Sequence, residues 1–288
     1  MDVAAPPVTR LALPDGRTLA FRSYGPEGGA PLLFVPGAAS GSLMRFGEDL
    51  LDDRALRLLS IDRPGLGHSD ADQDKSLTSV GDDLRELTAA LGRAVPVVAN
   101  SQGAPFALAA ALAGAGSRLV LVSPVDEVAH PATAAQLPGP VRELVAAVAA
   151  DPEEAAARFA GFSAQSFFDF VLGDHPGSDA AVFGDVGFRA LFRAALDEGF
   201  RRGSDGYARD TVLAMLPWRL DLDAIDLPVT ILFGADDATH SPDLGATLVA
   251  RITAAERIVV PGVGGSLLWA RPELVLDAAL AEPTLPRA

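Results

Sequence analysis

Short apolar segments alternate with helical patterns along most of this chain, and this alternation restricts the folds open to it. Six segments have the length and composition of buried parallel strands, at residues 31–36, 56–62, 95–100, 117–124, 227–234 and 256–262. Segments with the apolar spacing of helices lie at residues 82–92, 103–114, 244–252 and 271–281. Residues 9–25 hold two alternating runs around a Pro-Asp-Gly turn, which predicts a hairpin ahead of them. The pattern predicts one mostly parallel α/β sheet with helices on both faces.

One long segment after the predicted sixth strand interrupts this alternation. Residues 126–217 have helical pieces separated by prolines and hold nine of the 14 phenylalanines of the chain. We predict a helical cap over residues 126–217 and a core built from residues 1–125 and 218–288. The phenylalanines either form the core of the cap or line an apolar pocket beneath it, and both can hold together. Phe167 and Phe168 are the two expected to contact a substrate.

Composition excludes several classes of partner. The formal net charge is −15 and Lys75 is the only lysine, so nucleic acid and acidic membranes are poor partners. The chain has no cysteine, and its four histidines show no metal-ligand spacing, so no metal is expected. No nucleotide-binding glycine motif, signal segment or long apolar span occurs. We therefore expect a cofactor-free cytoplasmic protein that binds a small molecule; the sequence does not predict its oligomeric state.

A serine stands where a predicted strand meets a predicted helix. Residues 95–114 read as a strand, then Ala-Asn-Ser-Gln-Gly, then an apolar helix. A serine on so tight a turn needs small neighbours two positions away, and Ala99 and Gly103 are small. The helix N-terminus can also stabilise negative charge beside Ser101. This favours a nucleophile elbow over a serine that only caps a helix.

Five further motifs keep the order and spacing of one known family. They are PDGRTLAFRSYG in the hairpin, VPGAAS after the third strand, IDRPGLGHSD after the fourth, LFGADD after the seventh and PGVGGSLLWARPE after the eighth. With the elbow, they make the chain resemble the α/β-hydrolase superfamily, in its capped esterase-like and epoxide-hydrolase-like branch. The resemblance covers residues 9–124 and 217–281, with the insertion in the position of the cap. It implies an α/β-hydrolase fold.

The resemblance also implies roles for individual residues. Ser101 would be the nucleophile, and the backbone N–H groups of Gln102 and Ala38 would form the oxyanion hole. The neighbours of Ala38, Gly37 and Ala39, would contact substrate. In the Gly-x-x-Asp pattern after the seventh strand, Asp237 would be the acid of the triad.

The position of the catalytic histidine in this family is occupied by Gly265, the second residue of a Gly264-Gly265 pair. A serine hydroxyl is a poor nucleophile unless a base takes its proton, so an ordinary triad is incomplete here. His240, three residues after Asp237, is one possible substitute base.

His130 is a second possible base, because it follows Asp126 at the entrance to the predicted cap. His68 lies in the loop after the fourth strand and His175 lies within the cap, so both are weaker candidates.

Three functions remain open. The first is an enzyme of specialised metabolism that acts on an apolar ester, thioester, lactone or polyketide-like compound, where Ser101 and the oxyanion hole promote cyclisation, elimination or rearrangement. The second is ordinary acyl hydrolysis with His240 or His130 as a relocated base. The third is an inactive hydrolase fold that binds a ligand. A glycine introduced in place of a natural histidine at position 265 is a further alternative.

Overall fold

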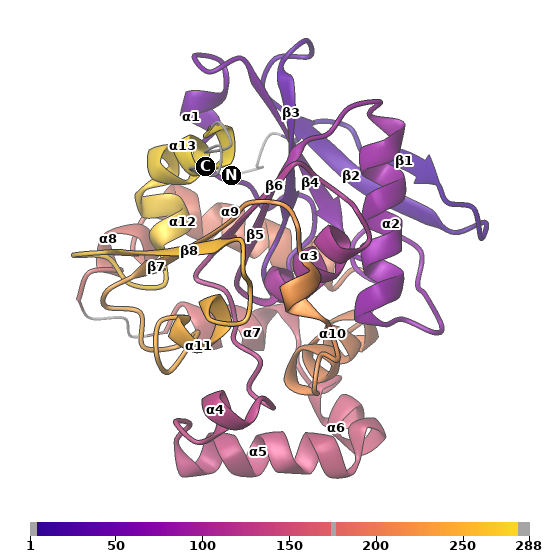
Figure 1. The fold of residues 1–288 in the computed structure, drawn as a ribbon. Helices are drawn as coiled ribbons and strands as arrows, with labels where there is room; N and C mark the ends of the chain where they lie inside the picture. The colour runs from indigo at the N-terminus through magenta and orange to yellow at the C-terminus, as the bar shows by residue number, and fades with distance from the viewer. Residues whose placement is uncertain (1–4, 174–176, 282–288) are drawn as a thin grey trace.

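A computed structural model describes residues 5–173 and 177–281, and its centre is one eight-stranded sheet (Figure 1). The strands lie in the order β1-β2-β4-β3-β5-β6-β7-β8. β2 is antiparallel to both neighbours, and every pairing from β4 to β8 is parallel. The bounds are β1 Thr9–Ala12, β2 Thr18–Tyr24, β3 Ala30–Val35, β4 Leu56–Asp62, β5 Pro96–Asn100, β6 Arg118–Val122, β7 Val229–Gly234 and β8 Ala255–Val260. The predicted fold class, with its hairpin and mostly parallel sheet, is confirmed.

Alternate side chains of the central strands are buried on opposite faces of the sheet, which is why these strands are apolar throughout. In β3, Leu33 and Val35 pack in a cluster with α2 (Leu77–Ala90) and α3 (Ala104–Leu112). Leu32 and Phe34 belong to the cluster on the other face, which includes α1 (Glu48–Leu51), α12 (Leu267–Ala270) and α13 (Pro272–Leu280). Helices therefore cover both faces, as the sequence predicts.

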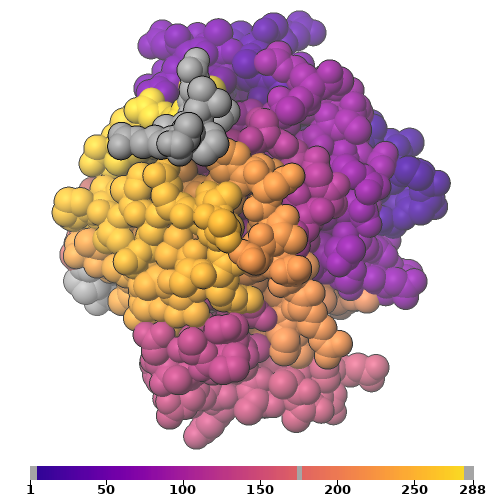
Figure 2. Space-filling model, viewed as in Figure 1, coloured from indigo at the N-terminus to yellow at the C-terminus, as the bar shows by residue number. Residues whose placement is uncertain are grey.

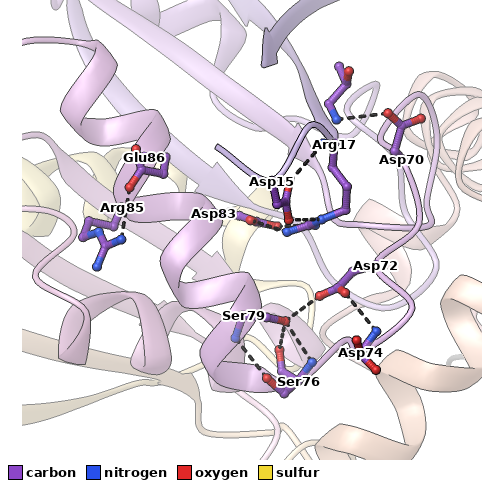
Figure 3. Close-up of polar contacts among 11 residues, drawn as sticks. Asp15, Arg17, Asp70, Asp72, Asp74, Ser76, Ser79, Asp83, Arg85 and Glu86 are labelled. Atoms are coloured by element: carbon purple, nitrogen blue, oxygen red, sulfur yellow. Dashed lines mark hydrogen bonds and ion pairs between the residues drawn. The ribbon is translucent and has the colours of Figure 1, made fainter. Parts of the chain in front are cut away.

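Polar contacts fix the start of α2 and attach the hairpin to it (Figure 3). Ser76 and Ser79 form a reciprocal capping box, each side chain accepting from the backbone N–H of the other. Arg17, in the turn between β1 and β2, donates to both carboxylate oxygens of Asp83 on α2 at 2.8 Å. This bidentate pair holds the hairpin against α2, on the face of the sheet that α2 and α3 cover.

The insertion between β6 and β7 is helical, and its α-helices lie between Pro131 and Met215. Its helices are α4 Pro131–Ala134, α5 Gly139–Ala150, α6 Pro152–Phe159, α7 Ala164–Val171, α8 Ala180–Phe183, α9 Val186–Gly199 and α10 Asp205–Met215. Helices α4, α5 and α6 gather at the lower end of the view in Figure 1, and the same segment forms the pink base of the surface in Figure 2. Phenylalanines of α7 and α9 pack in the cluster on the second face of the sheet.

The longest of the described helices, α2 and α9, have 14 residues each. None of the described helices combines the length and the hydrophobicity that crossing a bilayer requires.

Two sequence expectations differ from the structure. The helix predicted over residues 244–252 is reduced to α11, Ala246–Val249. Leu244 and Gly245 both have positive φ angles, 53° and 76°, so the helix starts only at Ala246. The predicted buried strand at 256–262 is β8, whose Ile258 and Val259 are 43% and 38% exposed. β8 is the last strand of the sheet, so it pairs only with β7. An apolar run alone does not distinguish an edge strand from a central one.

Candidate active site

Ser101 occupies a strained turn between β5 and α3. The turn is a single 3-10 segment, η1 Ser101–Gly103, and Ser101 has a φ of 49°. This left-handed backbone is costly for a residue with a side chain and is typical of functional turns. A Cβ atom at Gly103 would collide with the carbonyl oxygen of Val35, and Ala99 is completely buried. The close approach of the turn to β3 thus requires the glycine of the sequence motif at position 103.

The loop after β3 lies directly on Ser101. A Cβ atom at Gly37 would be 3.3 Å from the Cβ of Ser101. The next residue, Ala38, donates no backbone hydrogen bond to any described residue. Gln102 follows Ser101 at the start of the helix, and Ala38 lines the same cavity as Ser101. The two residues expected to form an oxyanion hole therefore both lie near the serine.

Asp237 follows β7 and is held by its own loop. Its side chain is fully buried. Oδ1 accepts a hydrogen bond from the backbone N–H of Thr239 at 3.1 Å, and Oδ2 lies 2.9 Å from Nδ1 of His240. Burial alone would raise the pKa of Asp237, but the hydrogen bond and the charge of His240 lower it to about 2. Asp237 is therefore a carboxylate that accepts from the imidazole, with Nδ1–H as the donor.

His240 occupies the space next to Gly265. A Cβ atom at position 265 would lie 3.0 Å from Cε1 and 3.2 Å from Nδ1 of the His240 ring. With Nδ1 on Asp237, the second nitrogen, Nε2, remains to face another group. His240, Gly265 and Ser101 all line one cavity. The absence of a side chain at position 265 thus makes room for an imidazole supplied by the neighbouring loop.

The loop after β7 and the loop after β8 can approach each other closely because β7 ends in a glycine, Gly234. A Cβ atom there would collide with the carbonyl oxygens of Val263 and Gly264. The backbone N–H of Asp236 also donates to the carbonyl of Val263 at 3.0 Å. The loop that carries His240 and the loop that carries Gly265 therefore pack backbone against backbone.

The first glycine of the pair has a different role from the second. Asp179 of the cap accepts backbone hydrogen bonds from Gly264, Gly265 and Ser266 at 3.1, 2.9 and 3.1 Å, and one from the Ser266 hydroxyl at 2.6 Å. A Cβ atom at Gly264 would collide with this carboxylate. Sequence reasoning missed Asp179, because nothing in a helical insertion indicates which backbone its carboxylate will meet.

The other histidines have different surroundings. His130 precedes α4 and is not among the residues that line the Ser101 cavity. Asp126, which precedes His130 in the chain, accepts from the hydroxyl of Ser241 at 3.0 Å. His68 contacts Arg201 through Nδ1 at 2.9 Å. His175 lies outside the described residues.

The cavity at Ser101 has a volume of about 110 Å³ and an aromatic wall contributed by the cap. It is lined by Gly37, Ala38, Ser40, Met44, Asn100, Ser101, Phe167, Val171, Phe183, Phe188, Phe192, His240, Gly265 and Trp269. Of the predicted contact residues, Gly37 and Phe167 line it, as does Ala38 of the predicted oxyanion hole, whereas Ala39 and Phe168 do not. Ala39 is completely buried, and the ring of Phe168 stacks on Phe192 at 6.0 Å. The lining includes no aspartate, glutamate, lysine or arginine among the described residues.

A larger cavity of about 620 Å³ lies between the loop after β4 and helices α6 and α10, and none of the predicted site residues lines it. Within residues 5–173 and 177–281, no cluster of three or more histidine, aspartate or glutamate side chains is arranged to hold a metal ion.

Structures of other proteins share this fold across nearly the whole chain. A hydrolase from Pseudomonas aeruginosa matches with 22% identity and a TM-score of 0.66, covering 96% of this chain and 98% of its own. An esterase from Exiguobacterium antarcticum matches with 18% identity and a TM-score of 0.68, covering 93% and 97%. An enzyme described as degrading N-acyl homoserine lactones matches with 20% identity and a TM-score of 0.62, covering 92% and 96%. At these identities the likeness shows the fold.

No curated protein matches the chain in sequence. The model of one family, described as the alpha/beta hydrolase family, matches residues 32–278, which include the elbow, the cap and the Asp237 loop. The chain belongs to the alpha/beta hydrolase family.

Proposed function

We propose that this protein is a serine hydrolase that cleaves esters with a short apolar acyl group, with His240 as its catalytic base. One observation carries the proposal: His240 bonds through Nδ1 to buried Asp237, fills the space beside Gly265 and lines the same cavity as Ser101. An acid, an imidazole and a strained serine are the components that acyl transfer by a triad needs. The imidazole comes from the acid's own loop instead of the loop after β8.

The chemistry follows from these positions. Nε2 of His240 takes the proton of Ser101 as Oγ attacks the ester carbonyl, and the N–H groups of Ala38 and Gln102 stabilise the oxyanion. His240 then gives that proton to the departing alcohol, which leaves Ser101 acylated. A water molecule, deprotonated by the same imidazole, releases the acid and restores the serine. Asp237 stays ionised and stabilises the imidazolium in both steps.

The cavity limits the acyl group. An apolar cavity of about 150 Å³ holds a benzene molecule, so the 110 Å³ at Ser101 suits a smaller apolar group. The lining offers aromatic rings and no charged partner other than a protonated His240, which disfavours a charged acyl group. We therefore propose acyl groups of about two to four carbons, with the alcohol portion outside the cavity.

Labelling by a fluorophosphonate, followed by intact-mass spectrometry, tests the proposed function. We expect the wild-type protein to gain one adduct, because an activated serine attacks phosphorus as it attacks a carbonyl. Ser101→Ala is expected to gain none. His130→Ala serves as the matched control and is expected to label like the wild type, because His130 does not line the cavity.

A wild-type protein that gains no adduct would contradict this function. In that case, labelling of Gly265→His would indicate an elbow that lacks only its base, and cyclisation, elimination or rearrangement would become the leading chemistry. Saturable binding of a small molecule without turnover would instead favour a ligand-binding protein.

The cavity also predicts the preference for acyl chain length. We expect kcat/KM for p-nitrophenyl butyrate to exceed that for the octanoate by about 10-fold or more, because extra methylene groups do not fit. Phe188 lines the cavity and its ring contacts that of Trp269 at 4.9 Å, so Phe188→Ala should open the wall and reduce this ratio. Phe168→Ala is the matched control, because Phe168 and Phe188 both stack on Phe192 but Phe168 does not line the cavity. A wild-type preference for the octanoate would show that this cavity does not bind the acyl group.

A further inference from the structure

Arg63 is a completely buried arginine behind the loop after β3. It is 0% exposed and immediately follows β4, in the IDRPGLGHSD motif. Its guanidinium donates through Nη1 to the carbonyl oxygen of Pro36 and through Nη2 to that of Gly37 at 3.1 Å. Nε donates to Oδ2 of Asp210 at 2.8 Å. Because burying a charge is costly, these partners determine where the guanidinium lies.

The Gly37 carbonyl belongs to the peptide group whose N–H is that of Ala38. This peptide is trans, so its C=O and N–H point in opposite directions. With Arg63 on the carbonyl side, the Ala38 N–H points away from Arg63. A Cβ atom at Gly37 would lie 3.3 Å from the Cβ of Ser101, and both residues line the cavity with Ala38. A charged donor on the carbonyl also polarises the peptide, which strengthens its N–H as a donor.

The cap secures this arginine through helix α10. Asp210 of α10 is fully buried between two cations, Arg63 and Lys75. Nζ of Lys75 donates a further bond, at 2.6 Å, to the carbonyl oxygen of Pro64. The next residue of α10, Thr211, accepts from Nε2 of Gln102 at 3.1 Å. Two consecutive residues of α10, Asp210 and Thr211, thus bond to Arg63 and Gln102. Arg63 bonds to the loop that carries the Ala38 N–H, and Gln102 supplies the other proposed donor.

We propose that Arg63 is a positioning residue that orients the Ala38 N–H into the oxyanion hole, and that Asp210 of the cap holds Arg63 for this task. The proposal rests on the proposed function, because it concerns the transition state of acyl transfer at Ser101. It gives the cap helix α10 a part in catalysis, although no residue of α10 lines the cavity.

Arg63→Met tests the proposal and should still fold, because Lys75 remains to neutralise Asp210. We expect kcat for p-nitrophenyl butyrate to fall about 10²- to 10³-fold, as when one oxyanion donor is lost, with KM changed by less than about threefold. A trifluoromethyl ketone, which forms an anionic tetrahedral adduct with a serine, should lose affinity by about the same factor as kcat/KM. A merely structural role would lower the melting temperature without this matched loss.

Arg17→Met is the matched control. Arg17 also joins two elements through a bidentate ion pair, with Asp83, but this pair links the hairpin to α2 (Figure 3). We expect its kcat and its ketone affinity to equal those of the wild type. If Arg63→Met does not fold, Arg63→Lys carries the same prediction with a smaller loss, because one ammonium cannot span both carbonyls and Asp210 as the guanidinium fork does.

The outcomes separate the two proposals. A wild-type protein that is not labelled at Ser101 overturns the proposed function, and this inference fails with it. A labelled wild type whose folded Arg63 variants keep kcat and ketone affinity overturns the role of Arg63 alone.

Discussion

Replacing His240 with alanine is expected to lower kcat for a short ester by about 10⁴- to 10⁶-fold, with KM nearly unchanged, because Ser101 loses its base. The ring touches Asp237 and the space beside Gly265, and it lies at the edge of the cavity, so its removal should not unfold the protein. Steady-state and single-turnover kinetics measure the loss. Residual activity would come from the oxyanion hole and substrate binding alone.

A histidine at position 265 provides the matched rescue. Gly265→His by itself crowds His240, because its Cβ would lie 3.0 Å from Cε1 of that ring. In the double variant, His240→Ala removes the obstacle, and the Cβ of the new histidine would lie 3.6 Å from Oδ1 of Asp237. We expect the double variant to recover at least about 10²-fold over His240→Ala alone.

Two results would contradict the assignment of the base. If His240→Ala keeps activity within about tenfold of the wild type, the imidazole is not the base. If His130→Ala gives the large loss instead, the base comes from the entrance to the cap, and the apolar cavity described here is not the reaction site. Activity of Gly265→His alone, with an inactive wild type, would show that the His240 ring cannot reach Ser101.

The sheet was predictable because its central strands obey one strong rule. A strand with both faces covered must be apolar throughout, and β3 has Leu33 and Leu32 buried in opposite clusters. The same rule was wrong for β8, where Ile258 is exposed at the sheet edge. Whether a strand lies at the centre or at the edge of the sheet depends on the whole fold, and a short apolar run does not indicate it.

The positions of Ser101 and Asp237, the proposed nucleophile and acid, were predictable because each lies within three residues of the end of a strand. Ser101 follows β5 and Asp237 lies three residues after β7, and parallel strands bring their carboxyl ends to one edge. The proposed base was not settled by sequence, because the place of His240 beside Gly265 depends on the contact of two loops at Gly234. The sequence alone puts Gly265 at the position of the family's catalytic histidine and leaves His240 and His130 as alternatives for the base.

Asp237→Asn is expected to lower kcat by about 10⁴-fold while the fold stays intact. The asparagine oxygen can keep the hydrogen bond from the Thr239 N–H, which leaves the amide nitrogen facing Nδ1 of His240. An amide N–H donates where the carboxylate accepted, so the ring is forced into the tautomer with its hydrogen on Nε2. That tautomer cannot take a proton from Ser101. Kinetics at several pH values, with the melting temperature as a check on folding, measure the effect.

Asp236→Asn is the matched control, because it removes the same charge from the adjacent, exposed residue. We expect its kcat to stay within about threefold of the wild type, as for a surface carboxylate with no role in the triad. Since the pKa of Asp237 is about 2, the wild-type carboxylate is ionised throughout the pH range in which the protein is assayed. The ratio of the wild-type kcat to that of Asp237→Asn should therefore not approach one at low pH through protonation of this residue. Equal activities of Asp237→Asn and Asp236→Asn would show that the carboxylate does not orient His240, and the triad proposed here would then be wrong.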